Sequence, residues 1–287
     1  MITEYAYAKI NLSLDIIGRR SNGYHDVKMV MQTISLRDEL VFEKTDEGIS
    51  LETDSEVLNS ESASGSDNLV IKAARLLYER YPIPAGVSIK LKKNIPLAAG
   101  MAGGSADAAA TLRGINRLYK LGLSCDKLCK IGVEIGADVP FCVTGGTMLC
   151  EGIGEIMTPV MNNCQCLYVI CKPNVNVSTK AAYEMIDTHS NLSHPDVAGL
   201  VSGLEEGNLT KVAGLSANIF EKYTKEQYPE IAEIEDIMIN NGALCSVMSG
   251  SGPTVFGIFS DGFDVSKVID ILKADGSRFV CTARPCR

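Results

Sequence analysis

The sequence contains no apolar run that approaches the roughly 18 residues a membrane-spanning helix requires. Its first residues, Met1 to Lys9, also lack the basic segment followed by an apolar segment that marks a secretory leader. No low-complexity block and no long run of like charges interrupts the chain. We therefore expect a folded, cytoplasmic protein that does not associate with a membrane.

The ten cysteines lack the spacing of a metal site or a redox motif. No Cys-x-x-Cys occurs, and the closest pair, Cys164 and Cys166, has no second Cys or His pair nearby. Most of the cysteines lie in apolar segments, where a thiol behaves as a small hydrophobic group. We expect reduced, mostly buried thiols and no metal bound by cysteine.

Excess positive charge is absent too, since 27 Lys and Arg stand against 35 Asp and Glu, for a net charge of -8. This balance disfavours nucleic acid as a partner but leaves room for a local basic site that binds one phosphorylated ligand. A length of 287 residues favours one large domain or two closely packed ones.

Hydrophobic periodicity predicts mixed α and β structure in the first half of the chain. Alternation from Tyr5 to Ile17 predicts a half-buried strand, and the next three strands read as an antiparallel meander. A helix is expected to begin at the N-cap pair Asp67-Asn68 and to end near Tyr81. The expected strands are 5–17, 27–36, 39–43, 49–52, 87–92 and 147–151, and the later helices are 105–119 and 124–135.

The polar stretch Met161 to Asn163 suggests a boundary between two halves. Beyond it, with extra helices treated as an insertion, the order of elements is that of a split β-α-β-β-α-β arrangement. The expected strands are 167–172, 244–248, 254–259 and 278–283, and the expected helices include 179–187, 229–240 and 264–273.

The segment Pro96 to Ala110 joins a strand to an alanine-rich helix through three glycines and Ser105, a residue suited to the N-cap. Free backbone N–H groups and the helix dipole at such a junction form an anion site. The segment has no Gly-Lys-Ser/Thr and no G-x-G-x-x-G spacing, which excludes two common phosphate-binding folds. A plain glycine turn before a capped helix is the alternative interpretation.

A second glycine-rich segment, Ser249 to Thr254, lies between two expected strands and would by itself be a hairpin turn. Gly145 to Thr147 and Glu151 to Gly154 add further small residues. Together these segments indicate backbone that a polar ligand can approach closely.

Five residues have side chains suited to chemistry. Lys9 and Asn11 share the polar face of the first strand and either point into a cleft or face water. Asp138 follows a predicted helix end, where a turn or N-cap aspartate would also lie. Tyr24 and His25 follow a turn at a strand entrance, so base stacking and simple surface exposure are equally compatible.

Three elements in one order resemble the GHMP kinase superfamily: Ala8 to Leu12, Pro96 to Ala110, and Ser249 to Thr254. Within it, Gly23 to His25 and Gly136 to Phe141 are similar to members that phosphorylate a cytidine diphosphate-linked sugar alcohol for non-mevalonate isoprenoid synthesis. The resemblance spans nearly the whole chain.

The glycine loop departs from the family pattern in three places. Met101 replaces a common Leu, and Ala102 and Ala106 stand where relatives often carry Gly and Ser. Ser105 must therefore supply any hydroxyl contact to phosphate or metal. Ala102 also predicts that the backbone at this position does not need a strongly positive φ.

The resemblance implies an α+β GHMP kinase fold with two halves. Residues 1–160 would be a ribosomal-protein-like domain that binds ATP and carries catalysis, and residues 161–287 would be ferredoxin-like. ATP would bind with Mg²⁺ bridging its phosphates and Ser105 as the metal ligand from the protein. The implied nucleotide site comprises Asn68 near the adenine together with Pro96, Ala99, Gly100, Met101, Ala102, Gly103, Gly104 and Ser105.

The resemblance also implies that Asp138 is the base for the acceptor hydroxyl, while Lys9 polarises that hydroxyl and keeps Asp138 ionised. Tyr24 would stack on cytosine, His25 would make a polar contact to it, and a pocket of this kind should reject uracil. The implied substrate residues are Asn11, Tyr24, His25, Tyr183, Gly250, Ser251, Gly252 and Thr254. A monomer or a weak homodimer is expected.

Two alternatives remain. Another GHMP kinase, of the homoserine or mevalonate type, would leave Gly23 to His25 without a task. An RNA-binding module on a related fold would want a basic face with interleaved aromatic residues, which the acidic balance opposes.

Overall fold

The computed structural model describes residues 1–55, 58, 68–189 and 192–286. The chain forms two compact units, each built from segments that lie far apart in the sequence. The sequence-based division near residue 160 stays a prediction. The first unit comprises Met1–Ala8, Leu36–Leu97 and Ala102–Gly145, and the second comprises Lys9–Ser35, Ala98–Met101 and Gly146–Arg287.

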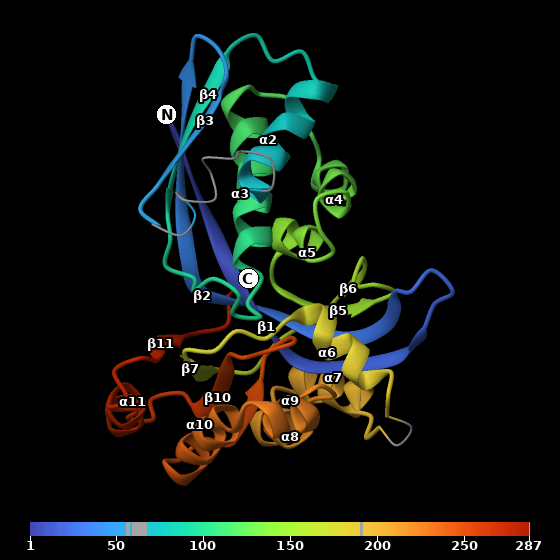
Figure 1. The fold of residues 1–287 in the computed structure, drawn as a ribbon, viewed down its shortest axis with the longest axis vertical. Coiled ribbons are helices and arrows are strands. Elements are labelled where there is room, and N and C mark those ends of the chain that lie inside the picture. Colours follow the sequence, from blue (N-terminus) through green and yellow to red (C-terminus); the bar gives the residue numbers. More distant parts are fainter. Residues whose placement is uncertain (56–57, 59–67, 190–191, 287) are drawn as a thin grey trace. The chain divides into compact units, whose positions relative to one another are not determined.

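Strand β4 (Gly86–Lys92) organises the sheet of the first unit (Figure 1). It pairs in antiparallel fashion with β2 (His25–Thr45) and in parallel fashion with β3 (Ile49–Thr53). The predicted antiparallel meander is therefore wrong, because β4 lies between β2 and β3.

The two strands expected at 27–36 and 39–43 are one long strand, β2. No glycine or proline interrupts the chain between these runs, so nothing forces a turn. Asp38 stays in the strand because its carboxylate accepts hydrogen bonds from the backbone N–H groups of Asn94 and Ile95.

Helices α2 (Leu69–Arg80), α3 (Gly103–Leu118), α4 (Cys125–Val133) and α5 (Val139–Thr144) complete the first unit. Alanines 106 and 108–110 of α3 are fully buried, since this helix lies inside the apolar core with α2 and α5 beside it. Gly114 is required there, because a Cβ at this position would lie 2.5 Å from the Phe42 ring.

The N-terminus of α2 confirms Asn68 as the N-cap residue. Its side-chain oxygen accepts a hydrogen bond from the backbone N–H of Val70 at 2.9 Å. Asp67, the other half of the predicted cap pair, lies outside the described residues.

The second unit contains a four-stranded sheet with the order β11-β7-β10-β9. Every neighbouring pair in it is antiparallel, and helices α10 and α11 pack against its strands. Numbered from β7, this order is fourth-first-third-second, which confirms the predicted split β-α-β-β-α-β arrangement. The elements are β7 (Cys166–Lys172), α10 (Pro229–Asn240), β9 (Cys245–Met248), β10 (Val255–Ser260), α11 (Ser266–Lys273) and β11 (Phe279–Ala283).

The remaining elements of the second unit include three short strands and four helices (Figure 1). Strand β5 pairs with β2 and β6, while β8 adds in parallel to β1 (Ile2–Arg19). No helix in the described ranges is long and apolar enough to cross a membrane. These elements are β5 (Thr147–Glu151), β6 (Ile156–Pro159), α6 (Thr179–Ile186), α7 (Val197–Glu206), α8 (Leu209–Leu215), β8 (Ala217–Asn218) and α9 (Glu221–Gln227).

Strand β1 follows the predicted alternation but is buried on both faces over Ala8 to Ile16. Lys9, Asn11 and Asp15 are each at most 4% exposed, so the half-buried strand of the prediction is wrong in this stretch. A polar face that is removed from water must be covered by polar groups. For Lys9 and Asn11 part of this cover comes from the glycine loops described next, and for Asp15 it comes from His194.

Candidate active site

The ammonium group of Lys9 lies in a small polar cluster of the second unit. Its Nζ donates to Asn11 Oδ1 at 2.6 Å and to the backbone oxygen of Gly100 at 3.0 Å. Both acceptors are neutral, and no carboxylate of the second unit, as far as that unit is described, forms an ion pair with it. A buried cation without a counter-ion is costly, so this cluster favours the arrival of an anion.

The two glycine loops meet around this cluster. The hydroxyl of Ser249 donates to the Gly100 carbonyl at 3.2 Å. The Ser249 Oγ also accepts a hydrogen bond from the backbone N–H of Asn11 at 3.3 Å. Gly100 has φ 68°, and a Cβ there would lie 2.4 Å from the Ser249 carbonyl oxygen. Only glycine fits at position 100, because the backbone of the second loop lies so close. The predicted approach of a ligand to this backbone stays a prediction.

Asn218, which the sequence interpretation missed, fixes the second glycine loop. Its Nδ2 donates to the backbone oxygens of Met248 and Gly250 at 2.6 and 2.7 Å. The Oγ1 of Thr179 lies 2.9 Å from the Ser251 Oγ and ties the loop to the start of α6. A lone asparagine in strand β8 carried no local signal for this role.

Thr254, another predicted substrate residue, is fully buried and its Oγ1 has no partner among the described residues. A side chain of this kind supports the loop from inside. Gly252 has φ 89°, and a Cβ on it would lie 2.6 Å from the Met248 sulfur. These two residues shape the loop through the backbone rather than by exposed side chains.

His25 and Tyr183, two of the three predicted cytosine residues, contact each other, whereas Tyr24 is exposed. The rings of His25 and Tyr183 stack with centroids 4.9 Å apart, and Phe220 contacts Tyr183 edge-on. His25 is 9% exposed and also bonds to Asp187, another residue that the sequence interpretation missed. Tyr24 is 61% exposed and has no ring contact among the described residues, so its stacking role stays a prediction.

Helix α3 begins in the first unit with free backbone donors. The first three N–H groups, those of Gly103, Gly104 and Ser105, have no acceptor within the helix. The N-cap residue is Ala102 and not Ser105, which corrects the prediction. With φ 56° Ala102 is left-handed, so the expectation of an ordinary φ at this residue is wrong as well.

A left-handed alanine costs about 1–2 kcal/mol. At Ala102 that conformation begins the helix early, so Ser105 lies in the first turn with its hydroxyl near the turn at Gly136. A Cβ on Gly136 would be 3.9 Å from the Ser105 Oγ. The arrangement leaves the Ser105 hydroxyl without a partner among the described residues and thus available to a ligand.

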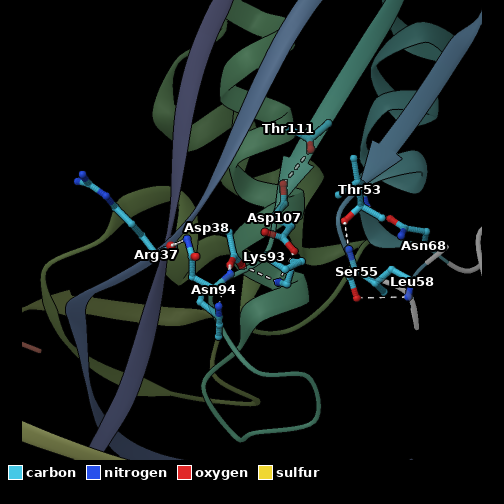
Figure 2. Close-up of polar contacts among 12 residues, drawn as sticks. Arg37, Asp38, Thr53, Ser55, Leu58, Asn68, Lys93, Asn94, Asp107 and Thr111 are labelled. Atoms are coloured by element: carbon cyan, nitrogen blue, oxygen red, sulfur yellow. Dashed lines mark hydrogen bonds and ion pairs between the residues drawn. The ribbon is translucent and has the colours of Figure 1, made fainter. Parts of the chain in front are cut away.

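A buried charged cluster lies beside the start of α3 (Figure 2). Lys93 Nζ is 2.5 Å from Asp38 Oδ2 and 2.8 Å from Asp107 Oδ2. It also lies 3.4 Å from the position that a Cβ on Gly103 would take. The sequence interpretation missed Lys93 and Asp38 and gave Asp107 no role, because the three belong to separate elements.

Two carboxylates share one ammonium here, so the ionised cluster has one negative charge in excess. Asp38 accepts from two backbone N–H groups in addition to Lys93, whereas Asp107 Oδ1 has no partner among the described residues. Burial therefore raises the pKa of Asp107 to about 8; the charge of Asp38 adds to this rise and Lys93 opposes it. Burial would lower the pKa of Lys93, but the two carboxylates outweigh that effect and raise it.

Asp138 lies at the N-cap position of α5 but does not cap that helix. Its carboxylate is partly buried and has no hydrogen bond or ion pair among the described residues. The capping half of the structural alternative is therefore wrong, whereas Asp138 does lie in a turn, as the other half expected. A carboxylate without a donor is free to accept a hydrogen bond from a ligand hydroxyl.

The described residues contain no cluster of three His, Cys, Asp or Glu side chains that could hold a metal ion. The predicted role of Ser105 as a ligand for Mg²⁺ stays a prediction. The remaining predicted nucleotide residues, Pro96, Ala99 and Met101, belong to the same loop and offer backbone groups only.

Comparison with known proteins identifies the family of this chain. Residues 68–146 match the GHMP kinases N terminal domain, and residues 200–278 match GHMP kinases C terminal. A 4-diphosphocytidyl-2-C-methyl-D-erythritol kinase of Caldicellulosiruptor saccharolyticus is 46% identical over 93% of this chain and 91% of that protein. The protein of that name in Lachnospira eligens is 48% identical over 89% and 88%.

Solved structures show the same fold. A crystal structure of 4-(cytidine 5'-diphospho)-2C-methyl-D-erythritol kinase has a TM-score of 0.82 and 29% identity and covers 99% of this chain and 100% of that one. A homoserine kinase from Cytophaga hutchinsonii has a TM-score of 0.77 at 20% identity, over 99% and 94% of the two chains, and shares the fold alone. The chain is an ATP-dependent small-molecule kinase that belongs to the GHMP kinase family.

Proposed function

We propose that this kinase transfers the γ-phosphoryl group of ATP to the 2-hydroxyl of 4-diphosphocytidyl-2-C-methyl-D-erythritol, in the non-mevalonate synthesis of isoprenoid precursors. Two relatives that are 46% and 48% identical to this chain are named for that activity, and the similarity covers about nine-tenths of their length. The site observation that supports it best is the buried Lys9 ammonium, whose two acceptors are neutral. It provides a place for an anionic ligand.

The nucleobase end of the substrate is assigned to His25 and Tyr183. Their rings stack with centroids 4.9 Å apart, so the pair combines aromatic surface with the polar edge of the imidazole. A cytosine ring combines a flat apolar face with hydrogen-bonding edges, which suits such a surface. A homoserine or mevalonate kinase would have no use for it, and this difference favours the cytidine compound over those acceptors.

The nucleotide phosphates are assigned to the glycine loop and the start of α3. Three unpaired N–H groups at Gly103 to Ser105 and the positive end of a 16-residue helix favour negative charge. Mg²⁺, when bound with ATP, would neutralise charge on the phosphate oxygens. Ser105 is the protein group that we assign to it.

Asp138 is assigned as the proton acceptor for the substrate hydroxyl. Its carboxylate has no competing donor among the described residues, so it can accept the hydroxyl proton directly. A carboxylate is a weak base for an alcohol, but a loose transition state lets the proton leave late. Lys9 is assigned to the negative charge of the substrate or of the transferred group.

The test is ATP consumption by the purified protein with Mg²⁺ and one acceptor at a time. The acceptors are 4-diphosphocytidyl-2-C-methyl-D-erythritol, homoserine, mevalonate and galactose. We expect turnover with the cytidine compound alone. Turnover only with another alcohol would keep the family and overturn the proposed substrate.

A further inference from the structure

Asp187 lies directly after helix α6 and connects two side chains that flank the turn between β1 and β2. Its Oδ1 lies 2.7 Å from His25 Nε2, and its Oδ2 lies 3.2 Å from Arg19 Nη1. Each carboxylate oxygen therefore has a partner of its own. All three residues belong to the second unit.

The contact with Asp187 determines which nitrogen of His25 carries the hydrogen. An ionised carboxylate only accepts hydrogen bonds, so Nε2 must be the N–H donor. In a neutral imidazole the other nitrogen, Nδ1, is then an acceptor. Arg19 supplies the counter-charge for Asp187, so the imidazole need not be protonated to balance the carboxylate.

The Nδ1 atom of His25 is available for a ligand. It has no hydrogen-bond partner among the described residues. It is also absent from the buried, unpartnered side-chain atoms of those residues, so it is not fully enclosed. The stacked Tyr183, itself held edge-on by Phe220, fixes the plane of the imidazole. Both the direction and the acceptor character of Nδ1 are thereby set before a ligand arrives.

We infer that Asp187 is a specificity-determining positioning residue, which holds His25 as a hydrogen-bond acceptor and so selects a cytosine base over uracil. The inference rests on the proposed function. Cytosine presents an exocyclic amino donor where uracil presents an oxygen acceptor. An acceptor at Nδ1 pairs with the amino group, whereas it would face the uracil oxygen as a second acceptor and leave both unpaired.

The first test is Asp187→Asn, assayed with the cytidine substrate and with the uridine diphosphate analogue of the same alcohol. The new amide can donate to Nε2, which would move the ring hydrogen to Nδ1 and turn the acceptor into a donor. We expect kcat/KM for the cytidine substrate to fall about 10- to 100-fold, mainly through KM. The preference for cytidine over uridine should shrink, and KM for ATP should not change.

A matched control is Asp15→Asn. Asp15 Oδ1 bonds to His194 Nδ1 at 2.8 Å, so this pair has the same chemistry at another histidine. The control should leave the cytidine preference unchanged. Equal losses of preference in the two variants would show that a general structural effect, and not the state of His25, sets the specificity.

The second measurement is the nitrogen-15 NMR spectrum of the three histidine rings. We expect His25 to be neutral with its hydrogen on Nε2 in the wild type, and on Nδ1 in Asp187→Asn. A wild-type His25 that is doubly protonated, or protonated on Nδ1, would overturn the inference even where the variant does not fold.

The two proposals fail in different ways. An unchanged cytidine preference in a folded Asp187→Asn variant removes the role of Asp187 and leaves the proposed reaction standing. A wild-type protein that phosphorylates neither the cytidine nor the uridine compound, but another alcohol, removes both.

Discussion

The chain buries two lysines in opposite surroundings, one in each unit. Lys93 contacts the carboxylates of Asp38 and Asp107, whereas the hydrogen-bond partners of the Lys9 ammonium in the described part of its unit are an amide oxygen and a backbone oxygen (Figure 2 shows the Lys93 cluster). A buried charge is tolerated when a partner compensates it. Two carboxylates thus compensate the charge of Lys93 inside the fold, whereas the charge of Lys9 is available to a ligand. What separates a structural from a functional lysine here is the partner and not the burial.

The largest effect that would test this comparison is expected for Lys93→Met. The substitution leaves Asp38 and Asp107 buried without a cation, which should lower the free energy of unfolding by about 3–5 kcal/mol. Urea unfolding followed by circular dichroism measures it. Lys9→Met is the matched variant and should change the same quantity by less than about 2 kcal/mol, since it removes a hydrogen-bond donor but strands no charge. Similar losses in the two variants would break the comparison.

Turnover should distinguish the two lysines in the opposite way from stability, because Lys9 is the one that we assign to the ligand. Lys9→Met removes a cation that faces the ligand, so kcat should fall about 10²- to 10³-fold in a protein that remains folded. Steady-state kinetics with saturating ATP measures this loss. Lys172→Met is the control, because Lys172, like Lys9, donates to neutral oxygens, those of Pro173 and Val175, but lies outside the proposed site. Normal turnover in Lys9→Met would remove Lys9 from the mechanism.

Asp138→Asn tests the carboxylate that we assign as the proton acceptor and that forms no ion pair among the described residues. We expect kcat to fall by about 10²-fold or more, because the amide cannot accept the hydroxyl proton, while KM for ATP stays the same. Asp126→Asn, at an exposed position in the first turn of α4, is the matched control and should be silent. A variant at position 138 with near-normal kcat would show that the proton leaves by another route.

The last test concerns pH and the excess charge beside Lys93. The folded pKa of Asp107 is about 8, and its ordinary value is 3.8. Between these values the folded state holds a proton that the unfolded state has lost, so the stability present at low pH declines as pH rises towards 8. The contribution is at most about 1.4 kcal/mol per pH unit.

Urea unfolding at several pH values between 5 and 8 measures this slope. Asp107→Asn should flatten it, because the amide is neutral throughout and the remaining pair of Asp38 and Lys93 is balanced. If the free energy of unfolding of the variant still falls with pH at the same rate, the proton is held by a group other than Asp107.

The sequence predicted best those features that depend on neighbours along the chain. The order of elements in the four-stranded sheet and the capping role of Asn68 follow from periodicity and cap chemistry. Lys9 and Asn11 could be placed on one face of a strand for the same reason. Their burial could not be predicted, because it depends on loops about 90 and 240 residues further along the chain.

Features that depend on contacts between distant segments escaped prediction. Asn218 and Asp187 are single polar residues whose partners lie far away in sequence, so no local pattern marks them. The left-handed Ala102 was missed since alanine gives no signal for a positive φ. The meander failed because strand pairing is set by the whole sheet and not by the order of strands.

The interleaved composition of the two units limits how this protein can be dissected. The backbone passes from one unit to the other after Ala8, Ser35, Leu97, Met101 and Gly145, so no single truncation delivers either unit whole. A fragment of residues 161–287 would leave β8 without its partner β1. We expect a split version of the enzyme to regain activity only when both pieces are produced together, which makes the fold suited to a two-fragment reporter rather than to independent modules.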